Sequence, residues 1–288
     1  MSALHDPGPV DVRFATDFFR RLRSNVLLAG AAAVAFLVTV VALAGPALAP
    51  HDPMQADLSL SLAAPCRQYP MGNDALGRCL LSRIIVGTRI SMALGTAVVV
   101  FSCLSGVAVG LVSGYHGGLV DELLMRVTDI FLSLPEMVAA MAIAGLMGPG
   151  TGNLLLALSL TAWMRYARLV RGITLSVRGR SYVRAAQFAG VRTWRILWRH
   201  ILPACFPQVI VLATVGLAKA VLAISALGFL GFGIQPPAPE WGALLLEGRN
   251  YLLTAPHLSL YPGMVIMLCV LSFNILGDAL RDSLDAGD

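Results

Sequence analysis

Long stretches without charged side chains dominate this sequence and constrain its fold more than any other feature. The windows that contain no Asp, Glu, Lys or Arg are residues 25–50, 91–120, 137–164, 220–239 and 251–277. Each is about as long as the ~20-residue apolar helix that crosses a bilayer. Only 13% of the 288 residues are charged, too few to cover a soluble globule of this size. The sequence therefore predicts an all-α polytopic membrane protein.

We predict six transmembrane helices, with the turn MGPGTGN between the third and the fourth. They cover about residues 25–48, 91–113, 127–146, 154–171, 206–229 and 258–280. The chain then divides into a tail (1–24), the first helix (25–48), a long loop (49–90) and a core with five further helices (91–288). Within the core, two loops stand out, at 180–203 and 233–257.

Arginine positions predict the orientation of these helices. The tail carries Arg13, Arg20, Arg21 and Arg23, and the loop after the fourth helix carries Arg178, Arg180, Arg184, Arg192, Arg195 and Arg199. Short loops rich in Lys and Arg stay in the cytoplasm. We therefore expect both termini and loop 180–203 to be cytoplasmic, and loops 49–90 and 233–257 to be extracytoplasmic. Because the basic cluster precedes an apolar run of full bilayer length, a retained first helix is favoured over a cleaved signal peptide.

The cysteines and the missing motifs limit the chemistry of the chain. Cys66 and Cys79 both fall in the long outer loop, where an oxidising compartment would allow a disulfide, and the sequence leaves bridged and free thiols open. Cys103, Cys205 and Cys269 lie in or beside the spans and are expected to be packing residues. No phosphate-binding GxxxxGK[ST] motif and no catalytic or metal-ligand cluster is present. Any energy source must therefore belong to another chain.

The stretch RSYVRAAQFAGVRTWRILWRHILP, residues 180–203, predicts a basic helical hairpin. We expect helices over 182–189 and 194–201, with Gly190 in the left-handed conformation after the first and Pro203 helping to end the second. The second helix has an apolar face, formed by Trp194, Leu197, Trp198 and Ile201. Its other face is basic and carries Arg192, Arg195 and Arg199. Docking into a partner's groove and contact with lipid headgroups are both compatible with this pattern. A DNA-binding helix-turn-helix is disfavoured, because the hairpin is tethered between spans.

Several motifs resemble a known family. The spacing Ala185-Ala186-x3-Gly190-x9-His200-x2-Pro203 resembles the "EAA" coupling loop of ABC importer permeases. From about residue 25 to 285 the chain looks like the second membrane subunit of the peptide/nickel/opine group. The blocks that carry this likeness are GNDALGRCLLSRIIVGTRIS, GGLVDELLMRVTDIFLSLP, YARLVR, LGFLGFGIQPPAPEWG and FNILGDALRDSLD. Arg184 stands in place of the family's glutamate, and Asn73 and Cys79 replace a threonine and an aspartate.

The resemblance implies a type I importer fold with a cytoplasmic coupling-helix hairpin. In this family two permeases form the pathway, two ATPases bind ATP and Mg, and an extracytoplasmic binding protein delivers the solute. This chain itself would hold no catalytic residue, metal or cofactor, and would not bind nucleic acid. Peptides are the expected solute, with nickel or a metal-chelator complex as the alternative; the competing class is a secondary transporter that needs no nucleotide. The residues expected to contact an ATPase are Tyr182, Arg184, Ala185, Ala186, Gly190, Trp194, Arg195 and Pro203.

Charged residues in or near the spans are costly there, and they mark pathways or ion pairs. We expect pairs one turn apart, Arg126 with Asp129 and Asp278 with Arg281. Lys219, the only lysine, either lines the pathway or is paired or directed to the interface. The arginines of the fourth helix, Arg165, Arg168 and Arg171, either extend to the interface or face a water-filled path or the partner permease. In the last outer loop, Trp241 and Tyr251 suggest a helix lying at the membrane interface.

Overall fold

The computed structural model describes Leu22 and residues 25–285, and this part of the chain is helical. The predicted tail, residues 1–24, therefore lies outside the described residues except for Leu22. The elements are α2 (Val26–Leu48), η1 (Leu58–Leu60), α3 (Leu80–His116), α4 (Gly118–Leu132), α5 (Glu136–Met147), α6 (Thr151–Arg178), α7 (Ser181–Phe188), α8 (Thr193–Ile196), η2 (Leu197–Ile201), α9 (Leu202–Phe229), α10 (Trp241–Gly248), η3 (Arg249–Tyr251) and α11 (His257–Asp285).

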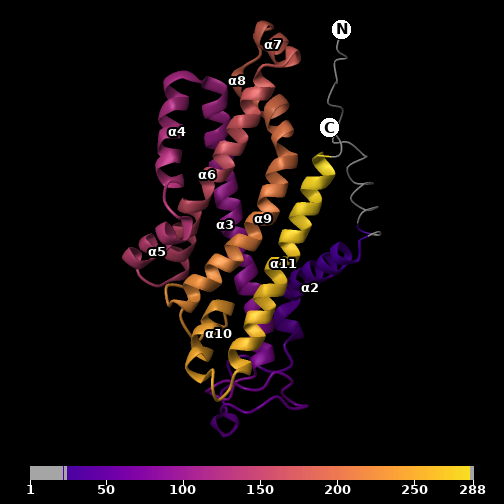
Figure 1. Ribbon diagram of the computed structural model, residues 1–288, viewed down its shortest axis with the longest axis vertical. Coiled ribbons are helices and arrows are strands. Elements are labelled where there is room, and N and C mark those ends of the chain that lie inside the picture. The colour runs from indigo at the N-terminus through magenta and orange to yellow at the C-terminus, as the bar shows by residue number, and fades with distance from the viewer. Residues whose placement is uncertain (1–21, 23–24, 286–288) are drawn as a thin grey trace.

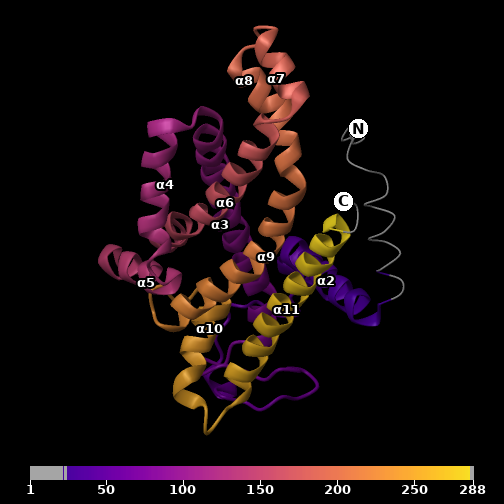
Figure 2. The same ribbon diagram turned by 45° about the horizontal axis from the view of Figure 1, so that its top comes forward.

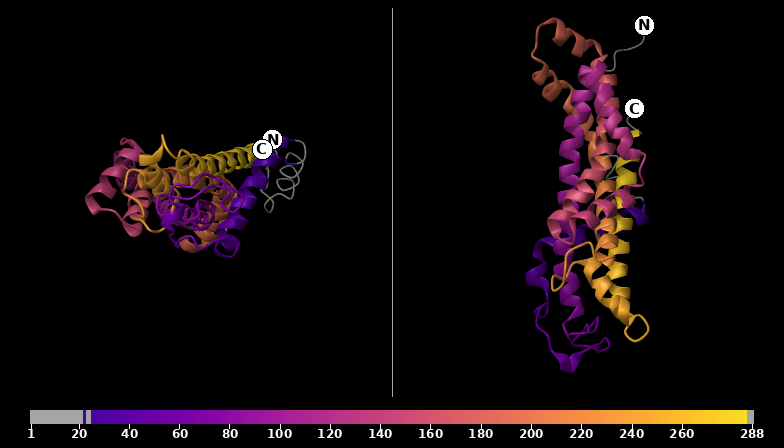
Figure 3. Two further views of the ribbon diagram at one scale, coloured as in Figure 1. Left: turned by 90° about the horizontal axis from the view of Figure 1, so that it is seen from below. Right: turned by 90° about the vertical axis from the view of Figure 1, so that its left-hand side faces the viewer.

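The long helices α3, α6, α9 and α11 run along the long axis of the molecule, as Figure 1 shows. The α7–α8 hairpin projects at one end, at the top of Figure 1, whereas α10 and the segment 49–79 lie at the other end (Figures 1 and 3). Helix α2 packs on α3 and α11, and α4 and α5 lie on the opposite side of the bundle (Figure 2). The predicted basic loop and the predicted outer loops thus occupy opposite ends, as the predicted topology requires.

The second long helix begins earlier than the sequence suggested. Helix α3 starts at Leu80 rather than at residue 91, so the predicted outer loop 49–90 is shortened by the first turns of α3. The charges of Arg83 and of the exposed Arg89 made these turns look like loop, since the charge-free window begins only after Arg89. In the structure the Arg83 side chain is fully buried among carboxylates, and its charge is compensated inside the fold. A search for charge-free segments excludes such turns, because it treats a buried, paired arginine in the same way as a solvent-exposed one.

The predicted third helix, residues 127–146, is wrong as a continuous element. The chain forms α4 and α5, which meet at an angle of 87° across a break at residues 133–135. Pro135 explains the break, since it lacks an N–H donor and disfavours the helical conformation of the residue before it. The two helices together would make one broken span or a re-entrant loop.

Among the described residues, four helices are long and apolar enough to cross a membrane: α2, α3, the continuous helix Thr193–Phe229 and α11. The bent α4–α5 pair would make a fifth. Helix α6, with 28 residues, is roughly 42 Å long, but its arginines interrupt the apolar sequence. The predicted count of six spans is therefore not confirmed, although each predicted span contains helix.

A stripe of glycines brings α3 and α6 into close contact. Gly106, Gly110 and Gly114 follow one another at a spacing of four residues on one face of α3. A Cβ atom added at these positions would lie 2.4 Å, 2.6 Å and 2.9 Å from carbonyl oxygens of α6. Small residues at this spacing let helix backbones approach each other, which is how membrane helices gain packing energy without a hydrophobic driving force. Because α6 leads into the hairpin, this contact also holds the base of the hairpin.

Candidate functional site

The hairpin turns at Gly190, as predicted. Gly190 has a φ of +72° and follows the C-cap residue Ala189 of α7. The N–H of Val191 donates to the carbonyl of Ala186 at 3.1 Å, and the N–H of Gly190 donates to the carbonyl of Gln187 at 3.0 Å. These two bonds form the Schellman motif that ends many helices at a left-handed glycine.

The second hairpin helix does not end at Pro203, contrary to the prediction. Helix α8 covers only Thr193–Ile196, continues as the π-helical turn Leu197–Ile201 and runs without a break into α9. Pro203 is the second residue of α9 and directly follows the π-helical turn, so it lies inside a continuous helix. The π-turn shifts the hydrogen-bond register just before the proline. The hairpin is therefore joined to α9 by continuous helix.

The hairpin has a buried base and an exposed rim. Val183, Ile196 and Ile201 are at most 1% exposed and pack with residues of α6 and α9. Phe188, Trp194 and Trp198 are 90%, 57% and 67% exposed. The predicted apolar face of the second helix is thus divided: Ile201 packs inward, whereas the two tryptophans stay on the surface. Exposed aromatic side chains on a projecting element are typical of a protein-binding surface.

The other predicted contact residues occupy this rim. Ala185 and the charged Arg184 and Arg195 are exposed, and so is Pro203, while Tyr182 and Ala186 are half-buried. The guanidinium of Arg195 lies 5.8 Å from the ring of Trp194. Residues 182–195 therefore present small, aromatic and basic side chains side by side.

Three ion pairs join α6 to the bent pair α4–α5. Arg165 contacts Glu136 at 2.7 Å, and Arg168 contacts Asp129 at 2.5 Å. The third pair is bidentate: the Nε and Nη2 atoms of Arg171 contact the two carboxylate oxygens of Asp121 at 2.5 Å and 2.6 Å. The three arginines follow at a spacing of three residues, and their partners follow in the opposite chain direction. The pairs compensate the arginine charges that interrupt α6.

The predicted short-range ion pairs are wrong. Arg126 pairs with Glu122 at 3.4 Å, and Asp129 pairs with Arg168 of another helix. No ion pair among the described residues joins Asp278 to Arg281. A spacing of three residues places two side chains on the same face of a helix, but the packing of a neighbouring helix decides which partner is nearer.

A buried charge network at the hairpin-distal end was missed in the sequence. Arg83, fully buried, donates to Asp74 and to both oxygens of Glu247, at 2.5 Å and 3.1 Å. Arg78 contacts the same two carboxylates at 2.6 Å and 3.0 Å. Two cations and two anions thus connect the outer segment, α3 and α10. The block GNDALGRCLLSR contains three of the four residues, so its alternation of acidic and basic residues was the available signal.

Of the two states that the sequence left open for Cys66 and Cys79, the structure has the unbridged one, with both cysteines as free thiols. Cys66 is exposed, whereas Cys79 is 3% exposed and forms an isolated antiparallel bridge with Asn73. Cys79 also precedes the first residue of α3 as its N-cap.

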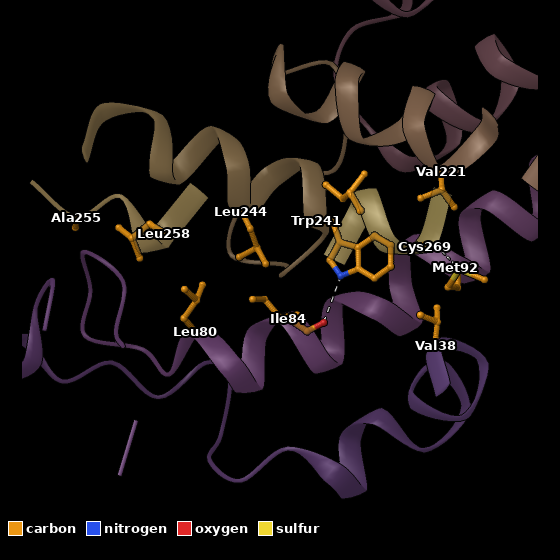
Figure 4. Close-up of a cluster of buried hydrophobic side chains, with 11 residues drawn as sticks. Val38, Leu80, Ile84, Met92, Val221, Trp241, Leu244, Ala255, Leu258 and Cys269 are labelled. Atoms are coloured by element: carbon orange, nitrogen blue, oxygen red, sulfur yellow. Dashed lines mark hydrogen bonds between the residues drawn. The ribbon is translucent and has the colours of Figure 1, made fainter. Parts of the chain in front are cut away.

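Helix α10 is anchored in the core rather than lying at an interface, which corrects the prediction for Trp241. This side chain is fully buried, and its indole N–H donates to the carbonyl oxygen of Ile84 at 3.3 Å (Figure 4). The adjacent Glu240 is also fully buried; it accepts from the Ser91 hydroxyl at 2.9 Å and from the N–H of Ala243 at 3.0 Å. Burial raises the pKa of the Glu240 carboxyl above its usual value.

The described residues contain no group of three His, Cys, Asp or Glu side chains placed to hold a metal ion.

Two family models match the sequence. The binding-protein-dependent transport system inner membrane component matches residues 106–287, and the N-terminal TM domain of oligopeptide transport permease C matches residues 13–65. The first range includes the hairpin, the three ion pairs of α6 and helix α10.

Curated relatives align with nearly the whole chain. A di/tripeptide transport system permease protein of Pseudomonas aeruginosa is 37% identical over 99% of this chain and 98% of its own length. A glutathione transport system permease protein of Pectobacterium atrosepticum is 38% identical over 93% of this chain and 90% of its own. A probable D,D-dipeptide transport system permease protein of Escherichia coli is 38% identical over 92% of this chain and 89% of its own length. The similarity therefore extends over both ends of the molecule and the bundle between them.

Proposed function

This chain belongs to the family of binding-protein-dependent transport system inner membrane components, and we propose that it is one of two permease subunits of an ATP-driven peptide importer. The observation that carries this proposal is an alignment covering 99% of the chain with a permease of a di/tripeptide transport system. Short peptides are the proposed cargo because the relatives described above are named for dipeptides, di- and tripeptides and glutathione. A second, homologous permease would complete the pathway.

The hairpin is the proposed coupling segment to a cytoplasmic ATPase. It projects beyond the bundle (Figure 3) and exposes Phe188, Trp194 and Trp198. Aromatic side chains of this size bury about 150–250 Å² each, and such anchors supply most of the energy of protein interfaces. Arg184 and Arg195 at the same rim favour an acidic groove in the ATPase. ATP and Mg would bind in the ATPase and not in this chain.

Continuous helix gives the hairpin a route to the bundle. The hairpin receives α6 and passes directly into α9, so a displacement of α8 would move α9 as one body. The glycine contact of α3 with α6 would carry the same displacement to α3. Closure of the ATPases on ATP would then favour one orientation of these helices over another, which is a population shift driven from outside this chain.

The proposed topology has six spans and both termini in the cytoplasm of a bacterial inner membrane. Helix α6 would be the fourth span, and its length of roughly 42 Å exceeds the ~30 Å of the bilayer core. Arg165, Arg168 and Arg171 can lie at membrane depth because each of these three pairs with a carboxylate of α4 or α5. The bent pair α4–α5 would be the third span. The end with α10 and segment 49–79 would face the binding protein.

A bulky substitution at the hairpin rim tests the coupling role. Ala185 is exposed, so Ala185→Trp changes the docking surface without disturbing the hairpin core, unlike the half-buried Ala186. In the complete transporter, reconstituted in vesicles, we expect at least a tenfold loss of ATP-dependent peptide uptake with normal insertion of the subunit. Ala33→Trp on the exposed face of α2 is the matched control and should transport normally. Normal uptake by Ala185→Trp would refute the coupling assignment, and ATP-independent uptake by the isolated wild-type chain would refute the proposed function.

A further inference from the structure

A small cavity is lined by residues of α3, α5, α6 and α9; Figure 1 shows where these helices lie. Its volume is about 30 Å³, enough for a water molecule or two but not for a peptide. Its polar lining residues are Ser102, Glu136, Arg165, Tyr166 and Lys219. The remaining lining residues are apolar. The five polar residues therefore form a cluster in otherwise apolar surroundings.

Lys219 is the charge in this group that the fold does not compensate. It is the only lysine of the sequence, and its side chain is exposed on α9. It lies about 15 Å from the C-terminal end of this helix. Within the described part of the chain, no hydrogen bond or ion pair involves Lys219. A lysine at this depth facing lipid is energetically unfavourable, so a partner or water must face it in the working protein.

Tyr166 offers an unused hydrogen-bond donor in the same place. Its side chain is 3% exposed, and its hydroxyl has no partner among the described residues. The hydroxyl lies against Gly216 of α9, where an added Cβ atom would be only 2.5 Å away. A buried hydroxyl without a hydrogen bond destabilises the fold, because it has lost its bonds to water. The close approach to a glycine therefore holds the donor in the cavity at a cost that a ligand could offset.

The charge balance of the cavity favours an anion. Glu136 and Arg165 compensate each other at 2.7 Å, which leaves the positive charge of Lys219. Ser102 also lines the cavity and is fully buried. The cavity thus combines one uncompensated cation with one free donor, which matches a carboxylate group.

We infer that this cavity is a transient contact site for the terminal carboxylate of a peptide during translocation, with Lys219 as its ion-pair partner and the Tyr166 hydroxyl as a hydrogen-bond donor. The inference rests on the proposed function, since it needs the exposed side of Lys219 to face the pathway. The Arg165–Glu136 pair then serves as a positioning element, because it fixes α5 against α6 at the mouth of the cavity.

Uptake measurements with two forms of one peptide test this site. The complete transporter is reconstituted in vesicles, and ATP-dependent uptake is measured for a peptide with a free carboxylate and for the same peptide as its amide. We expect Lys219→Met to lower uptake of the free acid about tenfold while changing uptake of the amide less than twofold, with Lys219→Arg restoring most of the rate. Because the binding protein is unchanged, its own preference cancels in each variant-to-wild-type ratio. Arg249→Met, which removes an exposed charge outside the spans, is the control and should leave both rates unchanged.

Chemical labelling gives an independent readout. As Lys219 is the only lysine, a membrane-impermeant amine-reactive ester can modify only this side chain and the N-terminal amine. We expect labelling of Lys219 in the assembled transporter and at least a twofold decrease during turnover with the free-acid peptide.

Three results would overturn the inference: unchanged uptake by Lys219→Met, an equal loss for acid and amide, or no labelling in any state. The second would indicate a structural pair with a carboxylate of the other permease, and the third a lysine sealed from water. Absence of ATP-dependent uptake by the wild type would instead refute the proposed function.

Discussion

Removing Arg83 should destabilise the hairpin-distal end of the molecule severely. This fully buried side chain donates to Asp74, to both oxygens of Glu247 and, at 3.3 Å, to the carbonyl oxygen of Pro237. In Arg83→Met the two carboxylates keep only Arg78, so one buried negative charge loses its compensation. Breaking a buried ion pair from one side costs about 3–5 kcal/mol. For a chain of this size that free energy corresponds to a decrease in Tm of roughly 6–20 °C.

Thiol exposure provides the assay. Cys79, Cys205 and Cys269 are buried, and a thiol-reactive fluorescent dye would report their exposure as the purified protein is heated in detergent. Changing the exposed Cys66 to Ser removes its background signal. Arg89→Met is the matched control, since this arginine of α3 is exposed and the same substitution there should change the Tm by no more than about 2 °C.

A double variant separates charge from packing. Arg83→Met combined with Glu247→Gln leaves Arg78 facing Asp74 at 2.6 Å and restores a neutral network. We expect it to recover at least half of the lost Tm, because the uncompensated charge is then gone. The reasoning is refuted if Arg83→Met unfolds at the same temperature as Arg89→Met. It is also refuted if the Tm decrease of the double variant equals the sum of the decreases caused by Arg83→Met and by Glu247→Gln alone.

Two further predictions concern packing and pH. Gly110→Leu should separate α3 from α6 and abolish uptake, because even a Cβ atom there would lie 2.6 Å from a carbonyl oxygen. The control Gly30→Leu, whose side chain meets open space, should transport normally. Normal uptake by Gly110→Leu would contradict the close contact between the two helices. Burial raises the pKa of Glu240, so its contribution to stability is present at low pH and is lost as the pH rises through that raised value. Glu240→Gln should remove the resulting decrease of Tm with pH between pH 5 and 9, about the range in which a buried carboxyl titrates. If Tm depends on pH in this variant as it does in the wild type, another group is responsible.

Local sequence patterns predicted much of the fold. Charge-free windows placed helix in every predicted span because the bilayer requires ~20 apolar residues in a row, and Gly190 marked the hairpin turn because only glycine adopts a positive φ without strain. The motifs were sufficient to indicate the family. The same windows failed where arginines interrupt a helix: Arg83 and Arg89 concealed the start of α3, and the arginines of α6 were assigned no partners.

The sequence by itself determined that this chain is a helical membrane protein with a basic hairpin, because apolar length, arginine distribution and glycine position are properties of the chain alone. Only the tertiary structure decided which charges meet. Asp129 pairs with Arg168 and not with Arg126, Trp241 lies in the core and not at an interface, and Lys219 is left without a partner among the described residues beside the cavity. Electrostatic energy depends on the distance between groups, and that distance is set by helices far apart in the sequence.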